Sequence, residues 1–285
     1  MTASPTRPLL RWHGGKWLLA PWIIGHFPPH RIYVEPFGGV ASVLLRKERA
    51  YAEVYNDLDE GVVNLMALLR NGHGETLAAK LRLTPFSRVE FERAYLPSDD
   101  IFESARRLIV RCFMGFGSDG HNTGNGRTGF RATSNKSGTI PAHDWANYPD
   151  ALLLVAQRMQ GVVVERRPAI DIMRQHDTPS TLHYVDPPYL PETRTARKRG
   201  DKCHAYRHEM TADDHRELLA VLRGLDGMVI LSGYPSTLYD DALPAWRRVE
   251  RKALADGARD RTEVLWINPA AASALGSGPL FEAAA

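Results

Sequence analysis

The chain has 285 residues, of which 44% are hydrophobic and 24% are charged, and its formal net charge is +3. This composition is typical of a globular protein with a large core and excludes a disordered or fibrous chain. No run approaches the roughly 20 apolar residues of a membrane span, and residues 1–11 lack the apolar segment of a signal peptide. The two cysteines, Cys112 and Cys203, match neither a disulfide framework nor a metal-ligand spacing. We therefore expect a cytoplasmic protein that binds no metal.

A glycine turn opens the ordered part of the chain. Residues 12–16 are Trp-His-Gly-Gly-Lys, and residues 17–24 form an apolar run of helical length. Paired glycines allow a ligand to approach the backbone closely, and Lys16 can bind an anionic group there. The alternative is an ordinary turn with a solvated lysine.

Residues 31–45 predict a strand, a glycine turn and a helix, which is the first unit of a nucleotide-binding sheet. Gly38 and Gly39 allow a cofactor to lie against the backbone, although the full G-x-G-x-x-G spacing is missing. Glu35 precedes this turn and would repel a pyrophosphate. An acidic residue here favours a cofactor that carries an ammonium or sulfonium group.

Residues 52–59 predict a second strand that ends in carboxylates. Asp57 lies at the offset from the glycine turn where an acid usually binds the ribose hydroxyls of an adenosine cofactor. The alternative is that Asp57 or Asp59 caps a helix over residues 60–69. Each carboxylate can serve one of these two roles.

The alternation of strands and helices breaks down from residue 71 to about residue 149. Helices are expected over residues 78–95 and 101–113, followed by a segment rich in Gly, Ser, Asn and Thr. This long segment is either a linker or a functional loop. It interleaves basic and aromatic residues, which favours contacts with phosphates and bases: Phe116, Arg127, Phe130, Arg131 and Lys136.

The α/β pattern returns with a helix to about residue 159, a strand over residues 162–165 and a buried strand over residues 181–185. The last strand leads into Asp186-Pro187-Pro188-Tyr189. The prolines stop the strand, so Asp186 is expected at the edge of the sheet where ligands bind in open α/β folds.

This turn has the chemistry of a clamp for an amino group. The carboxylate of Asp186 and the carbonyl of Pro187 are two adjacent acceptors without a competing N–H group. The ring of Tyr189 can stack on a planar base, a contact worth roughly 1–3 kcal/mol. The alternative is an ordinary turn in which Asp186 caps local N–H groups and Tyr189 belongs to the core.

A basic segment follows the clamp. Between residues 192 and 208 six basic residues oppose two acidic ones, a local balance of 6 − 2 = +4, and Arg194, Arg197 and Lys198 are expected to contact phosphates. Thr211 then caps a helix to residue 222, and a buried strand covers residues 228–232. Two closing strands over residues 247–253 and 262–267 and a loose tail from residue 270 complete the chain.

Together these motifs resemble the Dam-type family of DNA adenine N6-methyltransferases, in its α group and its phage and prophage branch. The resemblance extends from Trp12 to Pro269. Its pieces, in order, are Trp-His-Gly-Gly-Lys at 12–16, Val-Glu-Pro-Phe-Gly-Gly at 34–39, Asn-Asp-Leu-Asp at 56–59, Asp-Pro-Pro-Tyr at 186–189 and Arg-Thr-Glu-Val-Leu-Trp-Ile-Asn at 261–268. Ala41 stands where the family commonly has glycine.

The resemblance implies a Rossmann-like fold with a mostly parallel sheet and an antiparallel closing strand, and S-adenosylmethionine as cofactor. A catalytic domain over residues 1–71 and 150–270 would carry an inserted, mainly helical target-recognition region over residues 72–149, followed by a flexible tail over residues 271–285. The cofactor-binding residues that it implies are Trp12, Lys16, Glu35, Phe37, Gly39, Asp57, Leu58, Asp171, Ile172 and Asp186.

The implied reaction is methylation of a flipped adenine in double-stranded DNA by a monomeric enzyme of bacterial or phage origin. Asp186 and the carbonyl of Pro187 would accept the two N6 hydrogens while the base stacks on Tyr189. Three alternatives remain at this point: a cytosine-N4 methyltransferase, an RNA adenine methyltransferase, and a catalytically silent DNA-binding relative.

Overall fold

The computed structural model describes residues 4–118, 120, 127–132, 140–193, 207–255 and 259–276. The chain forms two compact units. The helical unit comprises Met1–Trp17, Gly39–Arg46 and Asp59–Val164. The sheet unit comprises Leu18–Gly38, Lys47–Leu58 and Glu165–Ala285.

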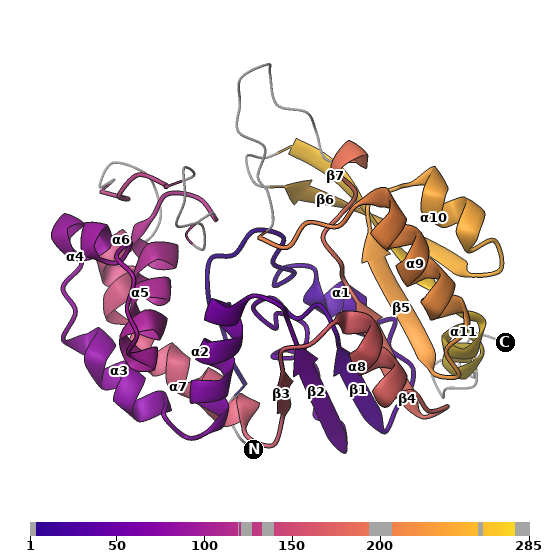
Figure 1. Cartoon of the computed structure of the whole chain (residues 1–285), viewed down its shortest axis with the longest axis horizontal. Helices are drawn as coiled ribbons and strands as arrows, with labels where there is room; N and C mark the ends of the chain where they lie inside the picture. Colours follow the sequence, from indigo (N-terminus) through magenta and orange to yellow (C-terminus); the bar gives the residue numbers. More distant parts are fainter. Residues whose placement is uncertain are drawn as a thin grey trace, which may run out of the picture. The chain divides into compact units, whose positions relative to one another are not determined.

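The strands form a seven-stranded sheet (Figure 1), with the strand order β3-β2-β1-β4-β5-β7-β6, and all but β3 lie wholly in the sheet unit. Strand β1 pairs in parallel with β2 and β4, β4 pairs in parallel with β5, and β7 is antiparallel to both β5 and β6. The predicted α/β class and the mostly parallel sheet with an antiparallel closing pair are confirmed. The strand bounds are β1 Ile32–Glu35, β2 Ala52–Asn56, β3 Val163–Glu165, β4 Thr181–Val185, β5 Met228–Gly233, β6 Arg247–Ala255 and β7 Arg259–Ile267.

The central strands are apolar and covered on both faces, as parallel strands usually are. All five residues of β4 and all six residues of β5 are buried. Val34, Val54 and Ile172 form one core cluster, and Val185, Leu231 and Trp266 belong to a larger one. The described helices of this unit are α1 Ala20–Ile24, α8 Ala169–Gln175, α9 Ala212–Arg223, α10 Thr237–Ala242, α11 Pro269–Gly276 and the short 3₁₀ helix η1 Pro191–Thr193.

The helical unit contains the region that interrupts the α/β pattern. Its described helices are α2 Glu60–Arg70, α3 Gly74–Arg82, α4 Arg88–Arg93, α5 Ile101–Met114, α6 Pro141–Ala146 and α7 Tyr148–Met159. The single helix expected over residues 78–95 is wrong, because the chain forms α3 and α4 with a break between them. Pro85 cannot continue a helix, and the Ser87 hydroxyl starts the new one by accepting from the Glu90 N–H at 3.2 Å.

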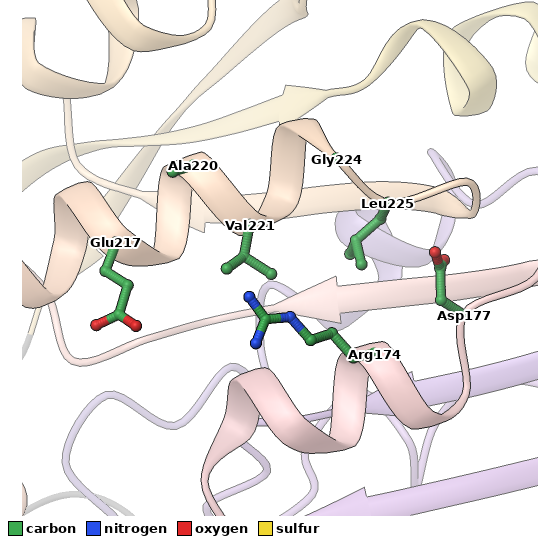
Figure 2. Close-up of a pocket in the computed structure, with 7 residues that line it drawn as sticks. All are labelled: Arg174, Asp177, Glu217, Ala220, Val221, Gly224 and Leu225. Atoms are coloured by element: carbon green, nitrogen blue, oxygen red, sulfur yellow. The ribbon is translucent and has the colours of Figure 1, made fainter.

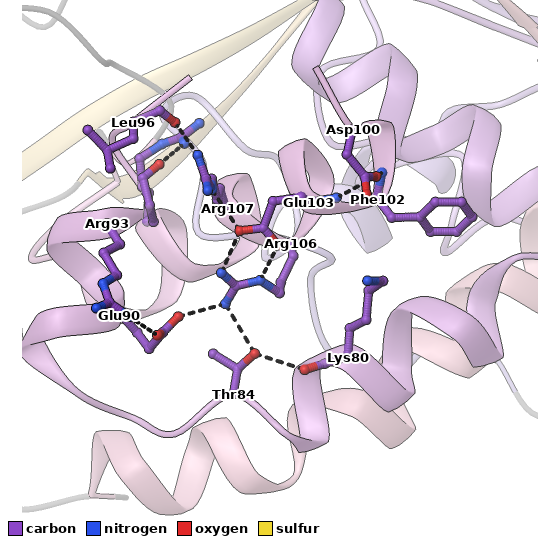
Figure 3. Close-up of polar contacts among 12 residues, drawn as sticks. Lys80, Thr84, Glu90, Arg93, Leu96, Asp100, Phe102, Glu103, Arg106 and Arg107 are labelled. Atoms are coloured by element: carbon purple, nitrogen blue, oxygen red, sulfur yellow. Dashed lines mark hydrogen bonds and ion pairs between the residues drawn. The ribbon is translucent and has the colours of Figure 1, made fainter. Parts of the chain in front are cut away.

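An ion-pair network connects the helices of this unit (Figure 3). Arg106 binds Glu103 through two nitrogens at 2.7 Å and Glu90 at 2.9 Å, and its guanidinium also donates to Thr84 at 3.1 Å. Arg107 binds the same Glu103 at 2.7 Å. The hydrogen bonds from Arg106 and Arg107 lower the pKa of Glu103 to about 2, so its carboxylate stays ionised and orients Arg106, whose bond to Glu90 connects α5 to α4.

Two further expectations are corrected by the structure. Residues 40–45 form turns rather than a helix, and Ala41 has a φ of 54°, which ends regular helix geometry there. The expected loose tail is helical to Gly276, because Pro269 occupies the first helical position and the Asn268 side chain accepts from the Ala271 N–H at 2.9 Å. Residues 277–285 lie outside the described part of the chain.

Candidate active site

The carboxyl ends of β1, β2 and β4 bring the predicted site segments to one edge of the sheet. These strands are parallel neighbours, with Val34 paired to Val54 on one side and to His183 on the other. Strand ends of parallel neighbours meet at the same edge. The residues at these ends are Glu35 as the last residue of β1 with Pro36 and Phe37 after it, Asp57 and Leu58 after β2, and Asp186 to Tyr189 after β4.

Asp59 and Asp57 have different roles. The Oδ1 atom of Asp59 accepts from the N–H groups of Gly61 at 2.9 Å and Val62 at 3.3 Å, so Asp59 caps α2. Asp57 makes no part of this cap. It lies half-buried after β2, and its backbone N–H donates to the carbonyl of Glu165 at 3.4 Å. The cap on α2 is thus made by Asp59, and the ribose contact of Asp57 stays a prediction.

In the turn formed by residues 186–189, Asp186 lies at the edge of the sheet and Tyr189 is more deeply buried. Asp186 is half-buried, and Tyr189 is 5% exposed. The Tyr189 hydroxyl donates to Glu263 Oε2 at 2.9 Å and lies 3.2 Å from Ser232 Oγ. Stacking of a base on Tyr189 therefore requires that a face of this ring be uncovered.

Three buried tyrosines surround the acidic groups of this edge. Burial first, and then the nearby carboxyls, raise the pKa values of Tyr33, Tyr184 and Tyr189 well above the ordinary value of 10.0. The carboxyls of Asp186, Glu35 and Glu263 each add to the rise in the pKa of Tyr184. All three phenols consequently remain protonated and can donate.

Glu35 is held in place from its own strand. It is almost fully buried at the end of β1, and its Oε2 accepts from the Tyr33 hydroxyl at 2.8 Å. A buried carboxyl is stable only with hydrogen-bond or charge partners. Its position beside the glycine turn, with an acceptor oxygen fixed by Tyr33, suits a cationic ligand.

Asn56 ends β2 and connects three segments of the edge. Its Nδ2 donates to the carbonyls of Pro36 at 2.9 Å and Arg167 at 3.0 Å, and its Oδ1 accepts from the Arg167 N–H at 2.9 Å. Its own carbonyl accepts from the Gly38 N–H at 2.8 Å. Sequence reasoning gave Asn56 no role of its own, because its partners lie 18 to 111 positions away.

The glycine turn is shaped by close packing. A Cβ atom on Gly38 would lie 2.3 Å from the Tyr55 ring, so only glycine fits there. Gly39, with a φ of 48°, belongs to the helical unit together with Trp12, and a Cβ on Gly39 would lie 3.5 Å from Trp12 Nε1. Lys16, in the same unit, is buried and donates to the Gly14 carbonyl at 3.0 Å, so the solvated-lysine alternative is wrong.

The remaining predicted cofactor residues differ in exposure. Leu58 is 40% exposed beside Asp57, and Phe37 packs against the larger core cluster of the sheet unit. Asp171 is exposed in the first turn of α8. Ile172 is fully buried against Val34 and Val54, so its side chain supports the sheet rather than facing a ligand.

The predicted DNA-binding residues that the structure describes are Arg127 and Arg131. The Arg127 guanidinium lies 4.9 Å from the ring centroid of Tyr95, and the Arg131 N–H donates to the Met114 carbonyl at 2.7 Å. Lys136, Arg194, Arg197 and Lys198 lie outside the described residues.

An aromatic cluster anchors this segment of the helical unit. Phe130 lies 5.2 Å from Phe86 and 5.7 Å from Phe91, measured between ring centroids, so it is packed rather than presented to bases. Phe116 is 64% exposed. Arg88, which sequence reasoning missed, lies 5.0 Å from the Phe130 ring and adds an exposed cation to this surface.

A surface pocket between α8 and α9 is separate from this edge (Figure 2). It has a volume of about 470 Å³ and is lined by Arg174 and Asp177 on one side and by α9 on the other. Asp177 accepts from the N–H groups of Asp226 at 2.8 Å and Gly227 at 2.9 Å, just before β5 begins. The pocket therefore lies toward the opposite, amino-terminal ends of the strands.

The described residues contain no group of three or more His, Cys, Asp or Glu side chains arranged to hold a metal ion. Among the helices of the described part of the chain, none has both the length and the apolar character needed to cross a membrane.

Known proteins resemble this chain over most of its length. The family model described as D12 class N6 adenine-specific DNA methyltransferase matches residues 12–243. The DNA adenine methylase of Escherichia coli strain K12 is 28% identical over 199 residues, which are 67% of this chain and 67% of the methylase. The DNA adenine methylase of Escherichia coli O157:H7 shows the same identity and coverage.

Proposed function

The chain belongs to the D12 class of N6 adenine-specific DNA methyltransferases, and on this premise we propose how its residues divide the work of the reaction. The activity is methylation of adenine N6 in DNA, with a bound methyl donor. The observation that carries the proposal is the meeting of Glu35, Asp57 and Asp186 at one edge of a parallel sheet.

We propose that the methyl donor is S-adenosylmethionine, which supplies an electrophilic methyl group on a sulfonium when it is bound. The acceptors of the sheet unit fit this group. Glu35 offers an oxygen fixed by Tyr33, which suits a cationic ligand, and Asp57 suits ribose hydroxyls. The exposed side chain of Leu58 offers an apolar surface for the adenine ring. For Trp12, Lys16 and Gly39, cofactor binding stays a prediction from the family resemblance.

The target base is proposed to be flipped out of the duplex, at a cost of a few kcal/mol. The N6 lone pair of adenine is conjugated into the ring and is a poor nucleophile. Asp186 and the Pro187 carbonyl accept the two N6 hydrogens, which draws the nitrogen toward tetrahedral geometry and frees its lone pair. Bound S-adenosylmethionine would supply the methyl group to this lone pair, and Asp186 or water would take the proton that N6 loses.

Positioning is expected to supply most of the rate acceleration. The methyl group is already activated, and correct placement of two reactants accounts for about 7–11 kcal/mol in favourable cases. The carboxyl of Asp186 adds stabilisation of the positive charge that develops on N6.

The test of this assignment is Asp186→Ala. We expect loss of methylation with DNA binding largely retained, and Asp186→Asn serves as the variant of equal size. Digestion of treated DNA to nucleosides identifies N6-methyladenine and distinguishes it from N4-methylcytosine. Methylation by Asp186→Ala at the wild-type rate would refute the clamp.

We propose that Arg127, Arg131 and Arg88 contact DNA phosphates, with Phe116 as the exposed aromatic residue of the same surface. Each phosphate contact that is lost reduces the slope of log K against log salt by about 0.9. Arg82 is the matched control, because this exposed arginine of the same unit already pairs with Asp150 at 2.8 Å. Arg88→Ala should lower the salt slope while Arg82→Ala leaves it unchanged. Equal slopes for wild type, Arg88→Ala and Arg127→Ala would refute this surface.

A further inference from the structure

The hydroxyl of Tyr189 is anchored by two neighbouring strands. Its hydrogen goes to Glu263 Oε2 on β7 at 2.9 Å, and Ser232 Oγ on β5 lies 3.2 Å away. All three side chains are buried. Glu263 is 74 positions from Tyr189 in the sequence, so only the fold brings the two together.

The strand register explains why both anchors reach the same atom. Ser232 of β5 pairs with Leu265 of β7, and directly paired residues of antiparallel strands lie on the same face. Glu263 precedes Leu265 by two positions and therefore points to that face as well. The sheet thus presents a hydroxyl and a carboxyl side by side beneath the ring of Tyr189.

The anchor sets the direction of the aromatic ring. Tyr189 meets Tyr234 edge to face, with ring centroids 4.5 Å apart and an interplanar angle of 71°. Such packing restricts a ring but does not hold its far end. The hydrogen bond at the phenol oxygen holds that far end in place, because a hydrogen bond weakens steeply when its angle changes.

We propose that Glu263 is a positioning residue for the target base: through the hydroxyl of Tyr189 it fixes the plane on which the flipped adenine stacks. This inference rests on the proposed function of Tyr189. Glu263 itself does not touch the base in this scheme. Its effect must therefore vanish when Tyr189 loses its hydroxyl.

The test is a double-mutant cycle with Glu263→Ala and Tyr189→Phe. Loss of one buried hydrogen bond that involves a charged partner corresponds to about a 10- to 100-fold change. We expect each single variant to lower kcat by that factor, with the KM for S-adenosylmethionine unchanged. The double variant should be no slower than the slower single variant.

Two further variants separate positioning from general stability. Glu263→Gln retains an oxygen that accepts from the phenol, and it should recover kcat to within about 3-fold of wild type. Glu250, an exposed residue of the neighbouring strand β6, is the matched control, and Glu250→Ala should methylate normally. Thermal melts establish that each variant is folded at the assay temperature.

A fluorescent base reports on the stacking directly. Once the methylated sequence is mapped, 2-aminopurine at the target adenine brightens when it leaves the DNA stack and dims when it stacks on Tyr189. Glu263→Ala should leave this base brighter than wild type does.

The outcomes distinguish this inference from the proposed function. Additive losses in the cycle, a wild-type kcat for Glu263→Ala, or a Glu263→Gln variant as slow as Glu263→Ala would each overturn the role of Glu263 while Asp186→Ala remains inactive. If Asp186→Ala methylates DNA, the proposed function itself fails.

Discussion

Replacement of Asn56 by alanine removes three side-chain hydrogen bonds at the carboxyl edge of the sheet, to Pro36 and twice to Arg167. Asn268 provides a matched control. Asn268 is 5% exposed and Asn56 is 1% exposed. The Asn268 side chain also makes three hydrogen bonds to backbone groups, those of Gly227, Val229 and Ala271. Its partners at residues 227 and 229 lie at the start of β5, on the opposite edge of the sheet.

Both substitutions should cost similar stability. At about 1 kcal/mol for each hydrogen bond, each variant loses roughly 3 kcal/mol of unfolding free energy. For a chain of this size that corresponds to a fall in Tm of roughly 6–12 °C. Calorimetry or thermal melts of the two variants measure this part of the prediction.

Only Asn56→Ala should weaken the methyl-donor site. Without the Asn56 side chain, Pro36, which directly follows Glu35 at the end of β1, and Arg167, which precedes α8, lose their hydrogen bonds to β2. A displacement of 1 Å in a binding site can cost 100-fold, so at least a 10-fold rise in the KM for S-adenosylmethionine is a modest expectation. Isothermal titration with S-adenosylmethionine, well below both Tm values, gives the affinity without turnover.

The refuting results are specific. If Asn268→Ala weakens S-adenosylmethionine binding as much as Asn56→Ala does, the effect is a general loss of stability. If Asn56→Ala binds the donor as wild type does, the edge does not depend on this side chain. Either result removes Asn56 from the donor site.

The remaining predictions concern stability. Gly38→Ala should lower the free energy of unfolding, measured in urea, more than Gly39→Ala does. A Cβ on Gly38 would lie 2.3 Å from the buried Tyr55 ring, whereas the φ of 48° at Gly39 destabilises alanine by only about 1 kcal/mol. Burial lowers the pKa of His183 from 6.5 to about 4, so the unfolded chain takes up the proton first and stability falls as pH drops from 6.5 to 4, by about 3 kcal/mol at most. Unfolding of His183→Leu should lack this part of the pH dependence, and an unchanged profile would contradict the assignment. Glu103→Gln should cost about 1–2 kcal/mol at pH 7 after allowance for solvent screening, and its penalty should shrink as pH falls below 4.5, since the native carboxyl has a pKa of about 2; a constant penalty would count against the network.

The sequence predicted the parts of the site that depend on near neighbours. Glu35, Asp57 and Asp186 are recognisable because each ends or directly follows a strand, and strand ends define an edge once the strands are parallel. Asp59 is recognisable as a cap because it precedes a helical pattern.

Two boundary errors had local signals that were underweighted. Pro85 inside the expected helix over residues 78–95 marks the break that separates α3 from α4. Asn268 before Pro269 is the start signal of a helix where a loose tail was expected from residue 270. In the first case a proline that ends a helix was passed over, and in the second a proline at the first position of a helix was not recognised as its start.

The residues that orient the side chains of the site could not be predicted, because their partners are distant in the sequence. Tyr189 and Glu263 are 74 positions apart, and Arg88 and Phe130 meet only through the folding of the helical unit. No period or spacing encodes such a contact. It follows from the strand order and register, which a single sequence does not specify.

The chemistry of the edge explains which ligands it favours and which choice it leaves open. Two of its phenols, those of Tyr33 and Tyr189, donate to carboxyls of the same edge, at 2.8 Å and 2.9 Å. The phenol donors of this edge thus bind its own carboxylates. The carboxylates and the Pro187 carbonyl are acceptors, so they favour ligands that carry N–H groups and positive charge. An exocyclic amine and a sulfonium both meet that condition. Cytosine N4 meets it as well as adenine N6 does, so discrimination between the two bases has to come from the shape of the surface on which the ring lies, and therefore from whatever fixes the plane of Tyr189.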